Sequence, residues 1–249
     1  MDLPEQQVIA LQQPRALEFP DGDGKPMGET GIHVRQILDL LAALILYFRP
    51  RPDVYAGANM FVYYDANDPG QNVAPDVFVA LGVKPGERRS WKTWEEGKAP
   101  DVVFEITSKK TRNKDTDKKP EVYAGLGVRE YYLFDPLNEY LRPQLQGYRR
   151  VGGVFQRVVG RVLTSEVLGL ELRIKDDGRL HLFDPQRGEW LWTPAELGDR
   201  YEMLQARAEA ERARAEAERT RAEAEQARAE AAESELARLR AELAKLKGE

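Results

Sequence analysis

Acidic side chains stand in two short apolar runs that both open with Pro-Asp. The first run, PDVFVAL, begins with Asp76, and the second, PDVVFEIT, begins with Asp101 and carries Glu105 among apolar residues. An ionised carboxylate that leaves water needs a cation, a metal or a network of hydrogen-bond donors. The runs have the length and the β-branched content of strands. Glu105 therefore marks this part of the chain as the candidate centre of chemistry.

Side chains alternate along a strand, so Asp101 and Glu105 share one face of the second run. If the first run is its neighbour in a suitable register, Asp76 and Glu105 converge at one end of the sheet. Converging carboxylates predict a hard-cation site that suits Mg²⁺ or Mn²⁺ with several retained waters. The alternative is that each aspartate is a turn or capping residue at the start of its strand.

A cluster of basic residues follows the second run. A lysine of this cluster could polarise an attacking water or stabilise negative charge that develops on a phosphoryl group. The cluster as a whole could neutralise the phosphates of a nucleic acid beside the carboxylates, or it could be plain solvated surface. Its members, with Asp115 and Asp117 interspersed, are Lys109, Lys110, Arg112, Lys114, Lys118 and Lys119.

Two other groups of residues could take part in binding or chemistry. The loop 84–98 contains Arg88, Arg89, Trp91 and Trp94, which could contact phosphates and stack on bases. Packing of the tryptophans at the base of the loop is the favoured interpretation. His33 is interpreted as a partner of Glu29, four residues earlier, rather than as a catalytic base.

The first element that must position these residues is a helix. Apolar side chains in residues 32–48 follow the three-and-four spacing of a helix with a broad buried face. Thr30 is suited to cap its start, and Pro50 and Pro52 end it. The predicted buried positions are Ile37, Leu38, Leu41, Leu44, Ile45 and Phe48.

Strand-like runs and one short helix follow. Turn signals and glycines separate them, and the resulting order is helix, three strands, helix, strand. Two hairpins, at 145–159 around Gly152-Gly153 and at 179–192 around DPQRG, extend the sheet or form a flap. The predicted strands are 59–64, 76–81, 101–107 and 130–134, and the predicted second helix is 120–126.

The last part of the chain is a heptad repeat. Pro194 opens a long helix, and from Ala206 the sequence runs ARAEAER, ARAEAER, TRAEAEQ, ARAEAAE, SELARLR, AELAKLK. A seven-residue period favours a left-handed coiled coil, and alanine and leucine seams run through this one. Because alanine buries little area, a single solvated helix is the alternative. We expect a homo-oligomer that forms through this helix and is closed by Leu236, Leu239, Leu243 and Leu246.

Composition limits the class of protein. The chain has 249 residues, no cysteine and a formal net charge of −5. Disulfides and cysteine-based zinc sites are therefore excluded, and we expect a cytoplasmic location without a membrane partner. The longest apolar run, 37–48, is too short to span a bilayer. We expect an N-terminal arm over 1–26, one domain over 27–193 and the long helix over 194–249.

Several stretches together resemble a known family. They are GETGIHVRQI from Gly28, VAPDVFVALGV from Val73, WEEGKAPDVVFEITSKKT from Trp94, DTDKKPEVYAGLGVREYYLFDP from Asp115 and LQGYRRVGGVF from Leu145. In this order and spacing, over residues 27–193, the chain resembles the Uma family of restriction endonucleases, a branch of the PD-(D/E)XK nuclease superfamily. Many members of that family also end in an Ala/Arg/Glu heptad tail.

The resemblance implies an α/β (α+β) domain with a restriction-endonuclease-like αβββαβ core and divalent-metal-dependent nuclease activity. The metal-binding aspartate of the superfamily pattern falls on Asp76, and its second acidic residue falls on Glu105. Asp101 is a further candidate ligand. The metal implied is Mg²⁺ or Mn²⁺, and the partner implied is nucleic acid, with DNA expected.

The chain departs from the superfamily pattern at one position. The lysine expected two residues after the glutamate is replaced by Thr107. A lysine on the following helix, which the family commonly has, matches Lys119, although Pro120 puts this residue at the helix start. The acid on the first helix of the superfamily corresponds to Glu29.

Two functions from different classes fit the sequence. The first is a Mg²⁺-dependent endonuclease with Asp76 and Glu105 as ligands and Lys119 orienting the water. The second is a catalytically inactive module that keeps the nuclease fold and self-associates through its helical tail. Thr107 and the acidic net charge favour the second function.

Overall fold

The computed structural model describes residues 17–22, 30–108, 111, 113–160 and 162–246. Contacts between residues divide the chain into two units, Met1–Pro194 and Ala195–Glu249. The predicted site residues Glu29, Lys109, Lys110 and Arg112 lie outside the described part of the chain.

The first unit is built on a six-stranded sheet with the order β1-β4-β6-β7-β8-β9. Its neighbouring strands are antiparallel except for β6 and β7, which are parallel and are joined through helix α3 (Lys119–Leu126). A parallel pair requires such a crossover connection. The strands are β1 (Val54–Ala58), β4 (Val77–Leu81), β6 (Val102–Ile106), β7 (Glu130–Phe134), β8 (Leu145–Val151) and β9 (Val154–Val158).

The predicted αβββαβ core is confirmed, with one correction to its first strand. The order is α1 (Gly31–Phe48), β1, β4, β6, α3 and β7. The prediction that 59–64 forms the first core strand is wrong, because β1 occupies 54–58. Ala56, Gly57 and Ala58 of β1 have low β-propensity, which hid the strand. Gly57 is needed there, since a Cβ at this position would lie 2.6 Å from the ring of Phe78.

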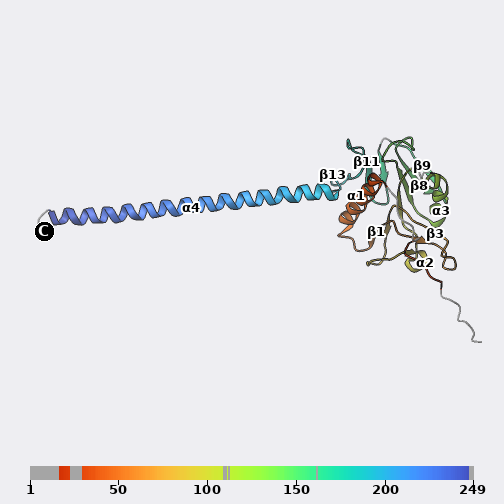
Figure 1. Cartoon of the computed structure of the whole chain (residues 1–249), viewed down its shortest axis with the longest axis horizontal. Coiled ribbons are helices and arrows are strands. Elements are labelled where there is room, and N and C mark those ends of the chain that lie inside the picture. The colour runs from red at the N-terminus through yellow and green to blue at the C-terminus, as the bar shows by residue number, and fades with distance from the viewer. Residues whose placement is uncertain (1–16, 23–29, 109–110, 112, 161, 247–249) are drawn as a thin grey trace, which may run out of the picture. The chain divides into compact units, whose positions relative to one another are not determined.

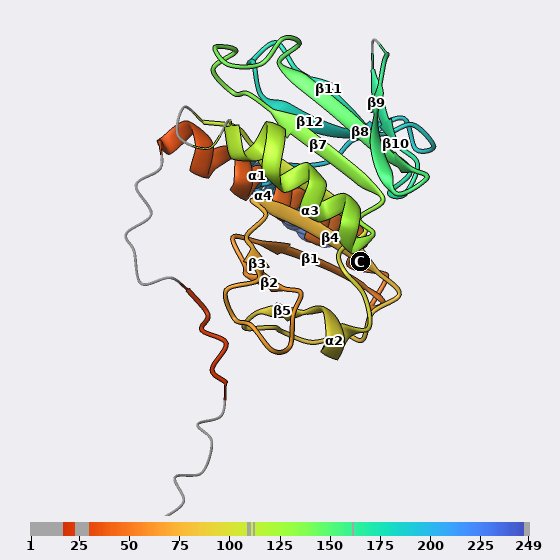
Figure 2. The ribbon, with the colours of Figure 1, turned by 90° about the vertical axis from the view of Figure 1, so that its right-hand side faces the viewer.

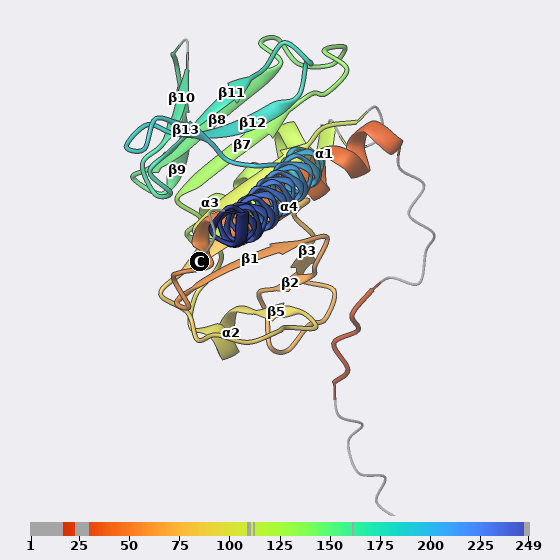
Figure 3. The same cartoon turned by 90° about the vertical axis from the view of Figure 1, so that its left-hand side faces the viewer.

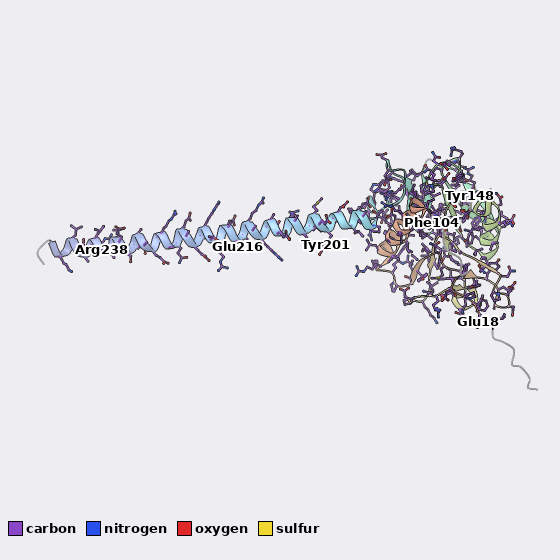
Figure 4. All side chains as sticks on the ribbon, in the orientation of Figure 1. Glu18, Phe104, Tyr148, Tyr201, Glu216 and Arg238 are labelled. Carbon is purple, nitrogen blue, oxygen red and sulfur yellow. The ribbon has the colours of Figure 1, made fainter. Side chains whose placement is uncertain are left out.

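The two faces of the sheet pack against different helices. One face, with Val77, Phe104 and Tyr132, packs against α1 and a second sheet, whereas the other face, with Phe78 and Val103, packs against α3. Figure 2 shows α3 running across one face of the sheet, and Figure 4 labels Phe104 within this unit. The alternation of side chains along each strand thus decides which residues can reach which helix.

Helix α1 buries polar as well as apolar residues. The predictions that Leu38 and Ile45 are buried are wrong, since they are 55% and 53% exposed. The buried face instead includes Gln36, whose amide hydrogen-bonds both the carbonyl oxygen and the N–H of Leu180, at 2.9 and 3.1 Å. The helix is apolar enough to cross a membrane by length and composition alone, but it packs here as the core helix of the sheet.

Two smaller sheets complete the first unit. The four-stranded sheet packs with α1 and is visible beside it in Figure 3. Both predicted hairpins are present, as β8–β9 and as β12–β13. The remaining elements are β2 (Val62–Tyr63), β3 (Asn72–Val73), β5 (Trp91–Lys92), α2 (Thr93–Glu96), the π-helical turn η1 (Lys114–Lys118), β10 (Leu163–Ser165), β11 (Leu170–Ile174), β12 (Leu180–Asp184) and β13 (Glu189–Trp190).

The described residues of the second unit lie in one uninterrupted helix, α4 (Pro194–Leu246), as Figure 1 shows. Side chains such as Tyr201, Glu216 and Arg238 project from it (Figure 4). Arginine and glutamate four residues apart form ion pairs along it, for example Arg219 to Glu223 at 2.9 Å. Each such exposed pair adds only a few tenths of a kcal/mol to helix stability.

One buried acid on the sheet has a purely structural environment. Glu130 on β7 is 1% exposed and accepts hydrogen bonds from the backbone N–H groups of Glu166 and Val167, at 2.8 and 3.3 Å. The hydroxyls of Ser165 and Tyr132 also donate to it. Glu130 therefore ties the turn between β10 and β11 to the central sheet.

We predict that Glu130→Ala lowers the free energy of unfolding by about 3 kcal/mol, because it leaves several buried donors without an acceptor. Urea denaturation followed by circular dichroism measures this loss. Glu139→Ala, in an exposed loop, is the matched control and should change stability by less than about 0.5 kcal/mol. Equal losses in the two variants would contradict the role given to Glu130.

Candidate active site

The register of two strands brings the predicted carboxylates together. Strands β4 and β6 are antiparallel with Val77 opposite Phe104, so Asp76 stands opposite Glu105. The N–H of Ile106 donates to Asp76 Oδ2 at 2.6 Å, which fixes the aspartate against the end of β6. The expected convergence of Asp76 and Glu105 is thus present.

Lys119 reaches the same point from α3. Its Nζ lies 2.7 Å from Glu105 Oε2 and 3.0 Å from Asp115 Oδ1. Lys119 is the first residue of α3, with Pro120 in the first helical turn, and the π-helical turn η1 comes directly before it. The helix start therefore directs the ammonium group into the cluster. Such π-helical turns occur frequently at functional sites.

Asp115 is a site residue that sequence reasoning did not assign. It is fully buried, and its backbone carbonyl accepts a hydrogen bond from the Tyr131 hydroxyl at 2.7 Å. The spacing of four residues between Asp115 and Lys119 was the available signal, since such residues share a helix face. No local pattern indicates that this face points inward.

His33 is a second residue that sequence reasoning did not place in the site. It is 4% exposed on α1, and its Nε2 lies 3.2 Å from Asp76 Oδ2. Thr30 accepts a hydrogen bond from the His33 N–H at 3.4 Å, so the predicted cap places this first turn. The expected pairing of His33 with Glu29 involves a residue outside the described part of the chain.

Burial and charge act in opposite directions on these groups. Burial, reinforced by the charges of Asp76 and Asp115, raises the pKa of Glu105 well above its ordinary value, and Lys119 opposes this shift. Burial also raises the pKa of Asp115. Burial alone would lower the pKa of Lys119, but Glu105 and Asp115 outweigh it and raise this pKa. Lys119 therefore stays protonated at every physiological pH.

The donor set fits a divalent cation with a partly aqueous shell. Three carboxylates face a single lysine cation, so a divalent ion would balance the excess negative charge when the acids are ionised. Mg²⁺ commonly takes one or two carboxylates and keeps several waters. Asp76 and Glu105 would be its protein ligands. No three acidic or histidine side chains of the described residues form a complete metal cage, and such a site does not need one.

Asp101 does not belong to this cluster, and the prediction that it is a metal ligand is wrong on this geometry. It shares a strand face with Glu105, but the two lie four residues apart, which corresponds to roughly 13 Å. Its carboxylate instead accepts from the Leu81 N–H at 2.8 Å and pairs with Lys98 at 2.5 Å. Asp101 is thus the structural aspartate of a strand start, which was the alternative left open.

Thr107 is buried at the end of β6, and its hydroxyl has no hydrogen-bond partner among the described residues. The ammonium group that contacts Glu105 belongs to Lys119 on α3. Ser108 takes part in a local turn, where its N–H and hydroxyl contact the Thr111 hydroxyl, both at 3.1 Å.

The remaining candidate binding residues separate into two groups. Lys118 is exposed, whereas the side chain of Lys114 lies outside the described set. The favoured packing holds for Trp91, which is buried, whereas Trp94 is 38% exposed. Arg88 pairs with Glu96 at 2.7 Å. Arg88 also lies over the rings of Tyr55 and Trp91. These contacts remove the inner part of the loop from consideration as a stacking surface.

Comparisons with known proteins add a family match. A model of the Uma2 family, described as "putative restriction endonuclease", matches residues 3–206 and so includes every residue of the cluster. A search of curated proteins returned no match. Among solved structures, the protein is similar to a "putative nuclease belonging to DUF820" from Anabaena variabilis ATCC 29413. The identity is 19%, the TM-score is 0.42, and the match covers 57% of this chain and 75% of that one.

We predict that Lys119→Met lowers the free energy of unfolding by about 3 to 5 kcal/mol at pH 8, because it leaves two buried carboxylates without their cation. The loss should be smaller at pH 5. Glu105 and Asp115 have raised pKa values in the folded protein, so they keep protons at a pH where the unfolded chain has released them. Stability then falls as the pH rises above the ordinary carboxyl pKa of roughly 4.

Urea denaturation of the wild type and Lys119→Met at pH 5 and pH 8 measures this dependence. Lys98→Met is the matched control, because its partner Asp101 keeps the Leu81 N–H as a donor and Lys98 is more exposed. Its loss should be small and similar at both pH values. A Lys119→Met loss that is the same at pH 5 and pH 8 would contradict the burial of unpaired carboxylates.

Proposed function

The chain belongs to the Uma2 family of putative restriction endonucleases, and we propose that it is a metal-dependent endonuclease that hydrolyses phosphodiester bonds, with DNA as its substrate. The observation that supports this most directly is the position of the Lys119 ammonium group. It lies 2.7 Å from Glu105, and the carboxylate of Asp76 stands on the neighbouring strand. This combination of two acids and one cation is suited to phosphoryl transfer.

Asp76 and Glu105 would hold Mg²⁺ or Mn²⁺. The bound metal would supply Lewis acidity toward a phosphoryl oxygen and lower the pKa of a water molecule. Asp76 is prepared for this by the Ile106 N–H and by His33, which both contact its Oδ2. The chain therefore supplies two preorganised carboxylates without a change in its backbone.

Lys119 acts as a fixed positive charge and not as a base, because Glu105 and Asp115 raise its pKa. Its ammonium protons can orient the attacking water and stabilise the negative charge that develops on the phosphoryl oxygens. Exposed Lys118, one residue before it, is placed to contact a phosphate of the backbone. Four further basic residues remain predicted to bind backbone phosphates: Lys109, Lys110, Arg112 and Lys114.

We predict that Glu105→Gln lowers cleavage of supercoiled plasmid in Mg²⁺ or Mn²⁺ by at least about 100-fold, because loss of a direct ligand should exceed the 10–100-fold typical of an outer-shell residue. Gel assays with circular single-stranded DNA and RNA beside the plasmid identify the preferred substrate. Glu121→Gln, exposed on the same helix as Lys119, is the control and should cleave as the wild type does. Equal activity in wild type and Glu105→Gln would exclude this function.

A non-catalytic binding module is the second candidate, and two observations favour it. Thr107 replaces a lysine of the superfamily pattern, and the chain has a formal net charge of −5. Calorimetric titration separates the candidates. Binding of Mg²⁺ or Mn²⁺ at millimolar concentration, lost in Glu105→Gln, favours the nuclease, whereas no binding favours the module.

We also propose that α4 pairs with the same helix of another copy. Along this helix the side chains of Leu236, Leu239 and Leu243 are about half exposed, at 51%, 51% and 55%. Their spacing of three and four residues forms one apolar seam, which is the pattern of a coiled coil. The alanine-rich part before them contributes length and little buried area, so association depends on the leucines.

We predict that deletion of residues 206–249 converts the oligomer into a monomer, as measured by size-exclusion chromatography with light scattering. Substitution of Leu236, Leu239 and Leu243 by glutamine should have the same effect while the helix is kept. Substitution of Glu209, Glu216 and Glu230 by glutamine, at exposed positions that lie outside both the leucine and the alanine seam, is the control. An unchanged mass after the deletion would exclude pairing through α4.

A further inference from the structure

Tyr123 contacts the carboxylate oxygen of Glu105 that Lys119 does not contact. It lies on α3, four residues after Lys119, and is completely buried. Its hydroxyl donates to Glu105 Oε1 at 2.8 Å, whereas Lys119 Nζ lies 2.7 Å from Oε2. Because residues four apart share a helix face, a single helical turn places one donor on each oxygen of Glu105.

We propose that Tyr123 is a positioning residue that holds Glu105 in the orientation required to bind the metal. This inference rests on the proposed function. The last torsion of a glutamate side chain has broad, roughly two-fold preferences, so packing alone does not select which way the carboxylate faces. A donor on Oε1 selects one orientation and leaves Oε2 directed toward Lys119. Among the described residues, these two donors account for all hydrogen bonds to the Glu105 carboxylate.

The surroundings of Tyr123 keep it a donor and keep its ring in place. Burial, together with the charge of Glu105, raises the pKa of the Tyr123 phenol well above its ordinary value, so the hydroxyl retains its proton. The ring of Tyr131 lies 5.5 Å from the Tyr123 ring, and both belong to the core between the sheet and α3. Removing only the hydroxyl should therefore leave the ring packed.

The same sheet provides a comparison pair. Tyr132 on β7 is buried and donates to the buried Glu130 at 3.2 Å. Glu130, however, has two backbone N–H groups and the Ser165 hydroxyl as further donors. Loss of the Tyr132 hydroxyl leaves that carboxylate fixed, whereas loss of the Tyr123 hydroxyl releases Glu105 Oε1. A Phe substitution at each position makes the same chemical change beside two different carboxylates.

The test compares Tyr123→Phe with Tyr132→Phe in the full chain. For Tyr123→Phe we expect kcat for plasmid cleavage to fall about 10–100-fold and the half-saturating Mn²⁺ concentration to rise by a similar factor, as for other residues that orient metal ligands. KM for DNA should not change, because Tyr123 is buried away from the substrate. For Tyr132→Phe, kcat and the Mn²⁺ dependence should equal those of the wild type. Circular dichroism and urea denaturation check that both variants fold.

Calorimetric titration with Mn²⁺ provides a second measurement that does not depend on cleavage. Weaker binding in Tyr123→Phe than in Tyr132→Phe supports the inference, and equal binding in the two variants overturns it. Absence of Mn²⁺ binding to the wild type also overturns it, because Glu105 would then have no metal to bind. The proposed function fails separately, when wild type and Glu105→Gln cleave equally. If Glu105→Gln cleaves far less than the wild type while Tyr123→Phe cleaves as well as the wild type, the proposed function stands and only the role of Tyr123 is excluded.

Discussion

The burial of the Glu105 carboxylate in the middle of an apolar sheet is the constraint on which the site depends. A charged group in this position is stable only if cationic or hydrogen-bonding partners reach it. Helix α3 supplies both kinds of partner within one turn, through Lys119 and Tyr123. The same helix is the crossover that makes β6 and β7 parallel, so the connection that builds the sheet also neutralises its buried charge.

The position of Lys119 explains why the buried carboxylate keeps a cationic partner although the strand itself carries no lysine. In the superfamily pattern the ammonium group comes from two residues after the glutamate, where this chain has Thr107. Here Lys119 delivers the group to Glu105 from the helix start, and Asp115 holds it from the preceding turn. Because both acids raise its pKa, Lys119 contributes a permanent positive charge. A protonated ammonium group can stabilise negative charge whether its lysine lies on the strand or on the helix.

The part of the site that the sequence predicted depends on short-range patterns. The period of two in the strands placed Glu105 on the face of the sheet that packs against α3. The Pro-Asp start of the neighbouring strand placed Asp76 beside the end of the Glu105 strand. Asp101 shares that period, yet it lies at the other end of β6, because distance along a strand cannot be inferred from the face alone. His33 and Asp76 are 43 residues apart, and no local pattern predicts that contact.

Short-range patterns also predicted the order of the elements in the fold, but not every element or every buried face. The order of elements in the core followed from periodicity, whereas β1 was missed because Ala56, Gly57 and Ala58 carry no strand signal. Leu38 and Ile45 have helical spacing but are exposed, since α1 uses Gln36 and other polar residues to contact β12. Hydrophobic spacing identifies a helix, but the partner of that helix decides which stripe is buried.

The two buried glutamates of this sheet, Glu105 and Glu130, are stabilised by different partners. This difference indicates which of them has a structural role and which is suited to chemistry. Glu130 receives four neutral donors, two of them backbone N–H groups of the turn that it holds, and the guanidinium of Arg149 lies 3.7 Å away. Any ligand that replaced these donors would break the attachment of β10 to the sheet. Glu105 receives one hydroxyl, from Tyr123, and one ammonium group, from Lys119. In the proposed reaction, a divalent cation would share the charge balance that Lys119 supplies without disturbing a strand, which makes Glu105, and not Glu130, the buried acid suited to bind it.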